Sequence, residues 1–190
     1  QGAMGRPAPA FLLAVIDEEG NECPVGTEGD IALRVAERRP PGLFTGYRGD
    51  PERTQSVFRH GWYLTGDRAW VDEDGFFWFV GRADDVILSS GYRIGPFEVE
   101  SALFEHPAVA ESAVVASPDD TRGEVVKAFV VLAKGYEPSD ELVKRLQDHV
   151  KATTAPYKYP RRIAFVGSLP KTVSGKIRRK ELRDAEWGEA

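Results

Sequence analysis

The sequence predicts an α+β protein of two parts, a β-rich N-terminal part over residues 1–83 and a compact α+β domain over residues 84–190. In the first part, runs of β-branched and aromatic residues alternate with Gly, Pro and Asp turns, and no obvious helical layer covers them. The second part alternates helical and strand patterns and, at about a hundred residues, is large enough to hold its own core. The character of the chain changes at Asp84-Asp85, which we take as the linker.

The N-terminal part is expected to consist mainly of strands. Runs of strand-forming residues predict strands at residues 11–17, 30–35, 62–71 and 76–81, and a short helix is expected over residues 51–59. Asp74-Gly75 between the last two strands predicts a two-residue hairpin turn, which places Asp67 directly opposite Arg82. A longer turn would leave the two side chains diagonal neighbours on the same face. By itself, such a pair is best explained as a cross-strand ion pair on a solvated hairpin.

The C-terminal part shows clearer helix signals. Pro96 suits the first turn of a helix predicted over residues 96–104. Ser139 is a good N-cap for a second helix, whose apolar stripe consists of Leu142, Val143, Leu146 and Val150. Apolar runs predict strands at residues 111–116, 125–132 and 162–166, and the chain should end in a helix over residues 177–185.

The composition limits the class of protein. A hydrophobic content of 42% can build a core, while no apolar run approaches the roughly 20 residues that span a bilayer. The single cysteine, Cys23, cannot form an internal disulfide and suits a reducing compartment, so we expect a cytoplasmic protein without a membrane span. Cys23 lies in a turn segment and is expected at the surface. His60, His106 and His149 lack metal-ligand spacing, so no metal site is predicted.

A second informative segment runs from Leu169 to Ile177, Leu-Pro-Lys-Thr-Val-Ser-Gly-Lys-Ile. Gly175 directly before Lys176 lets an ammonium point outward, where it suits a phosphate or a carboxylate that is gaining a bond to phosphorus. The segment is not a P-loop, because the upstream glycine is missing. A solvated basic loop is the simpler alternative, since other cations crowd around it. Nucleic acid is not expected as a partner, because the net charge is −5 and no stacking aromatics interleave the cations.

The order of four motifs resembles the adenylate-forming superfamily of acyl-CoA synthetases, luciferases and nonribosomal-peptide adenylation domains. The motifs are Tyr63-Leu-Thr-Gly-Asp67, Gly81-Arg-Ala-Asp-Asp85, Ser89-Ser-Gly-Tyr-Arg-Ile-Gly95 and Pro170-Lys-Thr-Val-Ser-Gly-Lys176. Residues 122–129, 154–161 and 182–187 are similar to the medium-chain acyl-CoA synthetases in particular. The resemblance extends from Met4 to Trp187.

The resemblance implies a domain organisation and nucleotide-binding roles. Residues 1–83 would be the last, distorted barrel-like subdomain of the large adenylation domain, and residues 84–190 the mobile C-terminal domain, with Asp84 as the hinge. Asp67 and Arg82 would bind the ribose of ATP or AMP, and Arg93 would approach phosphate. Lys176 would be the catalytic residue that bridges carboxylate and phosphate during adenylation.

The resemblance also implies a CoA site in the mobile domain. Ser90, Gly91 and Tyr92 would line the pantetheine tunnel after rotation. The CoA nucleotide would be held by Arg122, Lys151, Tyr159, Pro160 and Arg161, because guanidinium and ammonium groups suit its phosphates.

The implied parent is a ligase of fatty acid metabolism that converts a carboxylic acid, ATP and CoA to acyl-CoA, AMP and pyrophosphate through an acyl-adenylate. Nothing in the chain resembles the family's phosphate loop or the motif that helps to hold Mg²⁺, so the Mg²⁺ ligands would lie outside this chain. We therefore expect the fragment alone to be inactive. The truncated N-terminal unit is expected to associate through exposed Phe11, Phe44, Trp70 and Phe77.

Two alternatives remain open. The chain could be a non-catalytic truncated module that binds a nucleotide, CoA or a partner synthetase. It could also be part of a nonribosomal-peptide adenylation domain, which passes its acyl group to a carrier protein. The basic positions typical of CoA binding and the Glu186-Trp187 ending favour the acyl-CoA synthetase over the second alternative.

Overall fold

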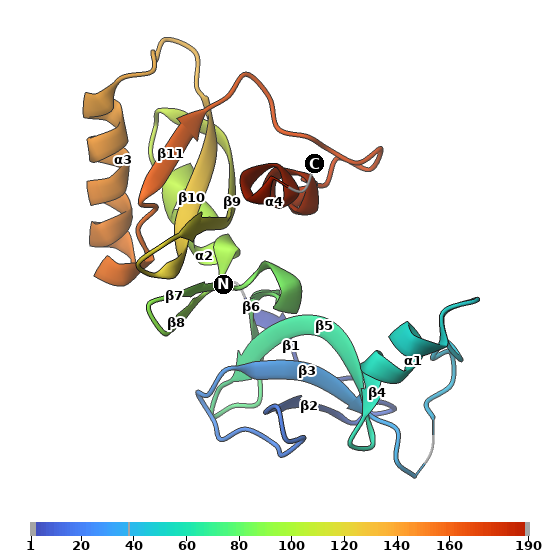
Figure 1. Cartoon of the computed structure of the whole chain (residues 1–190). Helices are drawn as coiled ribbons and strands as arrows, with labels where there is room; N and C mark the ends of the chain where they lie inside the picture. Colours follow the sequence, from blue (N-terminus) through green and yellow to red (C-terminus); the bar gives the residue numbers. More distant parts are fainter. Residues whose placement is uncertain (1–2, 38, 189–190) are drawn as a thin grey trace. The chain divides into compact units, whose positions relative to one another are not determined.

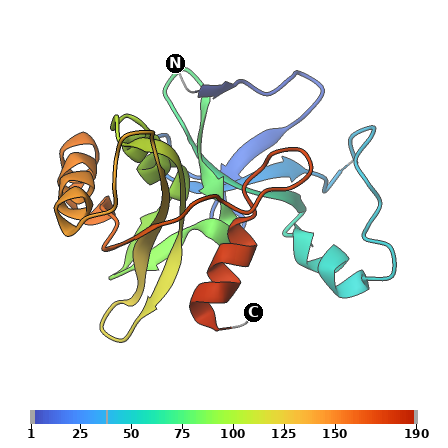
Figure 2. The same cartoon turned by 90° about the horizontal axis from the view of Figure 1, so that it is seen from above.

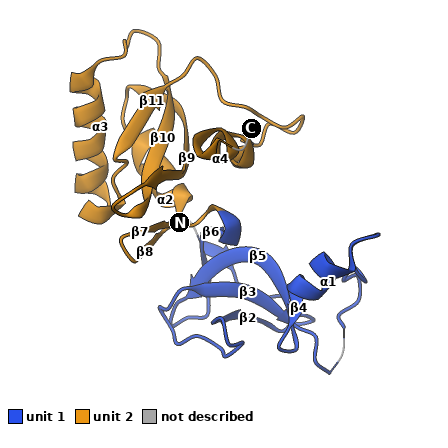
Figure 3. Ribbon diagram, viewed as in Figure 1, with its two compact units in different colours: residues 1–84 blue, residues 85–190 orange. Residues whose placement is uncertain are grey.

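The computed structural model describes residues 3–37 and 39–188, which form two compact units over residues 1–84 and 85–190 (Figure 3). Both units contain helices and strands, so the predicted α+β class is confirmed. Among the described residues, no helix is long and apolar enough to cross a membrane.

Unit 1 is built on one antiparallel sheet with the strand order β1-β6-β5-β3-β2, and β4 pairs with β5 beside this path. Its elements are β1 (Ala3–Gly5), β2 (Leu13–Ile16), β3 (Gly29–Arg34), α1 (Pro51–Val57), β4 (Phe58–Arg59), β5 (Trp62–Val71) and β6 (Phe77–Arg82). β5 is strongly curved (Figure 1). Within the described residues no ladder joins β1 to β2, so these strands form the two edges of the sheet.

Buried side chains lie on both faces of the unit 1 sheet, because neighbouring residues of a strand point to opposite faces. Val15 and Ile31 belong to one cluster with Ala69 and Phe77, whereas their neighbours Ile16 and Ala32 belong to another with Trp62. The expectation that Phe77 is exposed is therefore wrong.

The other aromatic residues expected to drive association also have contacts within unit 1. Trp70 stacks on Trp78 with ring centroids 5.4 Å apart, and Phe44 lies edge-on to Tyr47 and Tyr63. Only Phe11, at 37% exposed, lies at the surface in the way expected. Nothing in unit 1 therefore supports association through these four side chains.

Unit 2 contains a second sheet, in which β10 is central. Its elements are η1 (Ala83–Asp85, shared with unit 1), β7 (Ile87–Ser89), β8 (Tyr92–Ile94), α2 (Pro96–Phe104), β9 (Val109–Asp119), β10 (Gly123–Leu132), α3 (Asp140–Thr153), η2 (Pro156–Lys158), β11 (Arg162–Phe165) and α4 (Arg179–Trp187). β10 pairs antiparallel with β9 and parallel with β11, and at Gly123 it pairs with Ser89 of β7. Figure 1 shows α3 alongside β10 and β11.

The core of unit 2 lies between its sheet and two helices. The buried side chains of these helices are Val99, Ala102 and Leu103 from α2 and Leu142, Leu146 and Val150 from α3. They pack with strand residues such as Val114, Val126 and Val130 in one cluster. The hydroxyl of Ser139 accepts the Leu142 N–H at 3.1 Å, which confirms it as the N-cap of α3.

The predicted strand over residues 62–71 and helix over residues 96–104 are confirmed at both ends. The sequence interpretation missed β7 and β8, because three-residue strands are too short to show an alternating pattern. Ser90 and Gly91 join them with φ of 51° and 82°, the two left-handed residues of a tight hairpin turn. α4 begins after residue 177, because an isolated β-bridge between Lys171 and Ile177 keeps that part of the backbone extended.

Candidate functional site

Asp67 of β5 pairs directly with Arg82 of β6, and its Oδ1 accepts a hydrogen bond from Arg82 Nη1 at 3.1 Å. The pairing is confirmed, but the predicted two-residue turn is wrong. The Asp72 N–H donates to the Phe76 carbonyl, which leaves residues 73–75 in the loop. A register shift between Arg68 and Ala69 then leaves Val80 without a partner in the ladder. The longer loop shifts the register by one residue and the bulge shifts it back, so Asp67 still pairs with Arg82.

Asp72 holds the longer turn together. Its Oδ1 accepts the N–H groups of Asp74 and Phe76, and its Oδ2 accepts the Trp78 indole N–H at 2.8 Å. The pKa of Asp72 is lowered, chiefly by the hydrogen bond from Trp78 and then by that from the Phe76 N–H. This carboxylate therefore selects the turn length, because it satisfies donors that a two-residue turn would place elsewhere.

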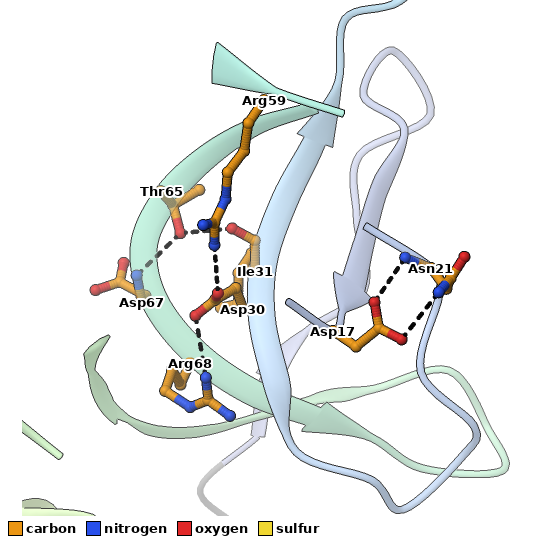
Figure 4. Close-up of polar contacts among 8 residues, drawn as sticks. All are labelled: Asp17, Asn21, Asp30, Ile31, Arg59, Thr65, Asp67 and Arg68. Carbon is orange, nitrogen blue, oxygen red and sulfur yellow. Dashed lines mark hydrogen bonds and ion pairs between the residues drawn. The ribbon is translucent and has the colours of Figure 1, made fainter. Parts of the chain in front are cut away.

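A bulge in β5 presents Asp67. Asp30 pairs with Arg68 and Ala32 pairs with Leu64, so residues 65–67 lie opposite the single residue Ile31. The Thr65 hydroxyl donates to the Ile31 carbonyl at 2.9 Å and accepts the Asp67 N–H at 3.2 Å (Figure 4). Bulges commonly re-aim side chains beside functional sites.

A partly buried ion-pair cluster lies beside this bulge, with Asp30 and Arg68 buried and Arg59 exposed. Arg68 Nη1 donates to Asp30 Oδ1 at 3.2 Å, and Arg59 Nη2 lies 3.5 Å from Asp30 Oδ2. In Figure 4 Asp67 points away from this cluster. The cluster joins β3, β4 and β5 and so supports the bulge. The sequence alone does not reveal this cluster, because Asp30 lies far from the two arginines along the chain and the three residues form no recognisable motif.

Gly66 allows Arg82 to lie close to the strand. Its φ is +80°, and a Cβ built there would lie 2.8 Å from Arg82 Nη2. We expect Gly66→Ala to destabilise unit 1 by roughly 1–2 kcal/mol through left-handed backbone strain and to displace the Arg82 guanidinium, which as the end of a flexible side chain can move at little further cost. Gly75→Ala is the matched control, since Gly75 has a φ of +79° but open space around its Cβ position. The two variants should therefore lose similar thermal stability, and a structure of Gly66→Ala with the Arg82 guanidinium unmoved would contradict the close contact.

In unit 2 the β7–β8 hairpin carries Ser90, Gly91, Tyr92 and Arg93. The Ser90 N–H donates to the Arg122 carbonyl at 3.5 Å, so the hairpin turn and Arg122 are neighbours. Arg122 Nη1 lies 3.8 Å from Asp119 Oδ1, and among the described residues no hydrogen bond, ion pair or cation–π contact joins its side chain to Lys151, Tyr159 or Arg161.

The Tyr92 ring stacks on Tyr157, with centroids 4.2 Å apart and an interplanar angle of 19°. Both rings remain substantially exposed. The sequence alone does not mark Tyr157 as a site residue. Its aromatic side chain is the one available signal, but its stacking partner Tyr92 lies on the β7–β8 hairpin, whose strands are too short to predict.

Lys151, Tyr159 and Arg161 come together around one ring. Lys151 Nζ lies 4.3 Å from the Tyr159 centroid, and Arg161 Nη1 donates to the Tyr159 hydroxyl at 2.8 Å. Pro160 between them is fully buried, and its carbonyl accepts from Gln147. Pro160 therefore offers no side-chain surface to a ligand.

Lys176 lies on a short loop with its own hydrogen bonds. The Thr172 N–H donates to the Lys176 carbonyl at 2.8 Å, and the Lys176 N–H donates to the Thr172 hydroxyl at 3.1 Å. Gly175 has a φ of +83°, a conformation that favours glycine. Lys176 is exposed, and within residues 3–37 and 39–188 no hydrogen bond or ion pair holds its ammonium.

Cys23 packs against an apolar cluster, and His106 and His149 have backbone hydrogen-bond partners. Cys23 is partly buried against the Val15 and Ile31 cluster, and burial raises the pKa of its thiol. His106 Nδ1 accepts the Ala108 N–H at 3.1 Å, and His149 Nε2 lies 2.9 Å from the Ala102 carbonyl oxygen. No group of His, Cys, Asp and Glu side chains suitable for a metal occurs among the described residues.

Comparison with known proteins finds one matching domain family and several similar sequences. Residues 98–176 match the AMP-binding enzyme C-terminal domain. The chain is 62% identical over 188 residues to the mouse mitochondrial acyl-coenzyme A synthetase ACSM3, with 98% of this chain and 32% of the relative covered. It is 61% identical over 191 residues to mouse mitochondrial ACSM4, with 100% and 33% covered. The chain thus spans about a third of the length of these curated relatives.

Solved structures are similar as well. The anthranilate CoA ligase AuaEII in complex with anthranoyl-AMP has a TM-score of 0.85 and 39% identity over 97% of this chain and 35% of that chain. ATP-bound MatB from Rhodopseudomonas palustris has a TM-score of 0.84 and 34% identity, with 97% and 35% covered.

These names correct the predicted location. The expectation of a cytoplasmic protein is wrong, because the similar curated relatives are named as mitochondrial. The expectation rested on a lone cysteine, which indicates only a reducing compartment and does not distinguish one such compartment from another.

Proposed function

We propose that this chain, which belongs to the adenylate-forming acyl-CoA synthetases and corresponds to their C-terminal portion, supplies the ribose-binding pair and the adenylation lysine of an ATP-dependent acid–CoA ligase. The complete enzyme would first join a carboxylic acid to AMP with release of pyrophosphate. The CoA thiol would then attack the acyl-adenylate and release AMP.

The observation that carries this proposal is the Asp67–Arg82 pair, set on a bulge within a chain that is similar to acyl-CoA synthetases over almost its whole length. The Asp67 side chain is 31% exposed, so its carboxylate remains accessible to ribose hydroxyls while Arg82 holds it in place. A carboxylate is the acceptor that such hydroxyls need.

The exposed ammonium of Lys176 supports its proposed catalytic role. It would bridge the carboxylate of the acid and the α-phosphate of ATP, where negative charge develops during adenylation. Arg93 on β8 would bring a second cation near phosphate, in either the adenylate-forming or the thioester-forming arrangement of the domains.

The second unit would also provide the CoA site. Ser90, Gly91 and Tyr92 on the hairpin turn would contact the pantetheine arm. Lys151, Arg161 and Tyr159 form a cationic and aromatic group that suits the phosphates and the base of the CoA nucleotide. Arg122, next to Ser90, would contribute from the same end of the sheet.

Between adenylate formation and thioester formation the C-terminal domain would rotate, and this rotation would need a hinge. The division of the chain into units that meet between Asp84 and Asp85 supports Asp84 as its centre. Mg²⁺, if the parent uses it with ATP, would be bound by residues outside this chain. We also propose a role in fatty acid activation and a mitochondrial location, by analogy with the curated relatives.

The proposal predicts that the 190-residue chain alone catalyses no ATP–pyrophosphate exchange, because it spans only about a third of its relatives. The full-length protein, assayed with medium-chain and benzoate-like acids, should show exchange that depends on the acid and does not need CoA. Acyl-CoA should form only when CoA is added.

Either of two results would contradict this prediction. One is exchange activity in the pure chain. The other is a full-length protein in which exchange requires CoA or fails with every acid of the panel.

A further inference from the structure

The helix that follows the Lys176 loop is held to unit 2 by charges rather than by a buried apolar face. α4 contains no buried residue. Its residues 179, 183 and 186 recur at helical spacing and share one face. Arg179 pairs with Glu100 of α2, Arg183 with Asp85 and Glu186 with Lys127 of β10.

The Arg179–Glu100 pair is the one nearest to Lys176. Arg179 Nε donates to Glu100 Oε1 at 3.0 Å and Nη2 donates to Oε2 at 2.6 Å, a bidentate geometry. The side chains are only 27% and 11% exposed. Bidentate pairs between arginine and a carboxylate are among the strong, directional contacts of proteins.

Glu100 is itself held in place. Its Oε1 also accepts the Val114 N–H of β9 at 2.8 Å, so its carboxylate is tied to the central sheet. Burial lowers the pKa of the Arg179 guanidinium, but the hydrogen bonds and the negative charge of Glu100 outweigh burial and raise it. Arg179 therefore links the start of α4 to a fixed point in the core of unit 2.

The Lys176 loop lies between two ion pairs, the strong Arg179–Glu100 pair after it and a weaker Lys171–Glu111 pair before it. On its entry side Lys171 Nζ lies 2.7 Å from Glu111 Oε2, but both side chains are more than 40% exposed, and such pairs contribute little. The Arg178 N–H donates to the Pro170 carbonyl at 2.9 Å and closes the loop. Glu100, Glu111, Lys171 and Gly175 line one groove of about 400 Å³, so both ion pairs belong to the same surface. Figure 2 shows the loop and α4 as one continuous segment of the chain.

We propose that Arg179 is a positioning residue, which through its bidentate pair with Glu100 fixes the loop that presents Lys176 for acyl-adenylate formation. The inference rests on the role of Lys176 given under the proposed function. Arg179 lies only a few residues beyond Lys176, so loss of the pair frees the C-terminal end of the loop. A misplacement of about 1 Å in a catalytic group can cost on the order of a hundredfold in rate.

The test uses the full-length enzyme with Arg179→Gln, and Arg178→Gln as the matched control. Arg178 is the adjacent arginine, and its pair with Glu181 is on the surface, with side chains 57% and 53% exposed. We expect Arg179→Gln to lower kcat for ATP–pyrophosphate exchange by roughly 10- to 100-fold, with KM for ATP changed by about twofold at most. The half-reaction from synthetic acyl-AMP and CoA should keep its rate, and the control should match the unmodified enzyme in both assays.

Two further variants separate positioning from a general loss of structure. Arg179→Lys keeps the charge and should recover part of the exchange rate. The double variant Lys176→Ala/Arg179→Gln should be no slower in exchange than Lys176→Ala alone, because Arg179 acts only through Lys176.

The inference is overturned by an unchanged exchange rate in Arg179→Gln, by equal losses in both half-reactions, or by an additive loss in the double variant. If Lys176→Ala is impaired in exchange and Arg179→Gln is not, only the positioning role fails. If Lys176→Ala itself exchanges at the normal rate, the proposed function fails and this inference fails with it.

Discussion

Replacing Lys176 with alanine in the full-length enzyme is expected to slow acyl-adenylate formation by about 10²- to 10³-fold, the usual effect of losing one positioned charge at a developing anion. The ammonium is exposed at the end of an ordered loop and is held by no hydrogen bond or ion pair within the described residues, so it is available to a ligand. The measurement is ATP–pyrophosphate exchange under saturating acid and ATP.

The second half-reaction distinguishes this role from a general one. Synthetic acyl-AMP and CoA should react at nearly the normal rate in Lys176→Ala, because the domain rotation would carry the loop away from the nucleotide. Lys180→Ala is a suitable control, since Lys180 is 79% exposed and pairs with Asp184 on the surface of α4. A loss of the same size in both half-reactions would indicate a role in folding or in general nucleotide affinity.

Leu146→Ala is expected to destabilise unit 2 by about 2–5 kcal/mol, the range for a leucine removed from a packed core. Leu146 is fully buried in the cluster formed by α2, α3 and the strands. Its truncation leaves a cavity that the surrounding helices can fill only in part. Amide hydrogen exchange in β9 and β10, which form the longest ladder of the unit, should report the loss.

Val173→Ala is the control, because Val173 is fully exposed on the Lys176 loop. With Trp187 of α4 replaced by phenylalanine in all variants, the tryptophans Trp62, Trp70 and Trp78 report on unit 1 alone, whose unfolding should be unchanged. A parallel loss of stability in unit 1, or a loss in unit 2 below about 1 kcal/mol, would show that Leu146 does not lie in an independent core.

Much of the local structure could be predicted from the residues. The helix from Pro96 to Phe104 follows from a proline at its first turn and from an apolar face at helical spacing. The N-cap Ser139 with Asp140 and Glu141 in the first turn marks the start of α3 in the same way. The pairing of Asp67 with Arg82 was also predicted, although two deviations from the expected hairpin had to cancel for it to occur.

The bulges of unit 1 could not be predicted. The turn is longer than expected because Asp72 accepts hydrogen bonds from two backbone N–H groups and from the Trp78 indole. The bulge in β5 depends on the Thr65 hydroxyl, whose partner Ile31 lies 34 residues away. A side chain in a turn or strand has several backbone partners available, and only the assembled sheet selects among them.

By itself, the sequence determined the α+β class, the approximate positions of the longer elements and the chemical groups available at the site. Each of these depends on the backbone preferences and spacing of a few neighbouring residues. The tertiary structure alone decided that Tyr157 stacks on Tyr92, that Pro160 is buried, and that Arg179 meets Glu100 from 79 residues away. Such contacts depend on how the elements pack together, because the hydrogen bonds and apolar burial that stabilise them exist only once distant segments of the chain are brought together.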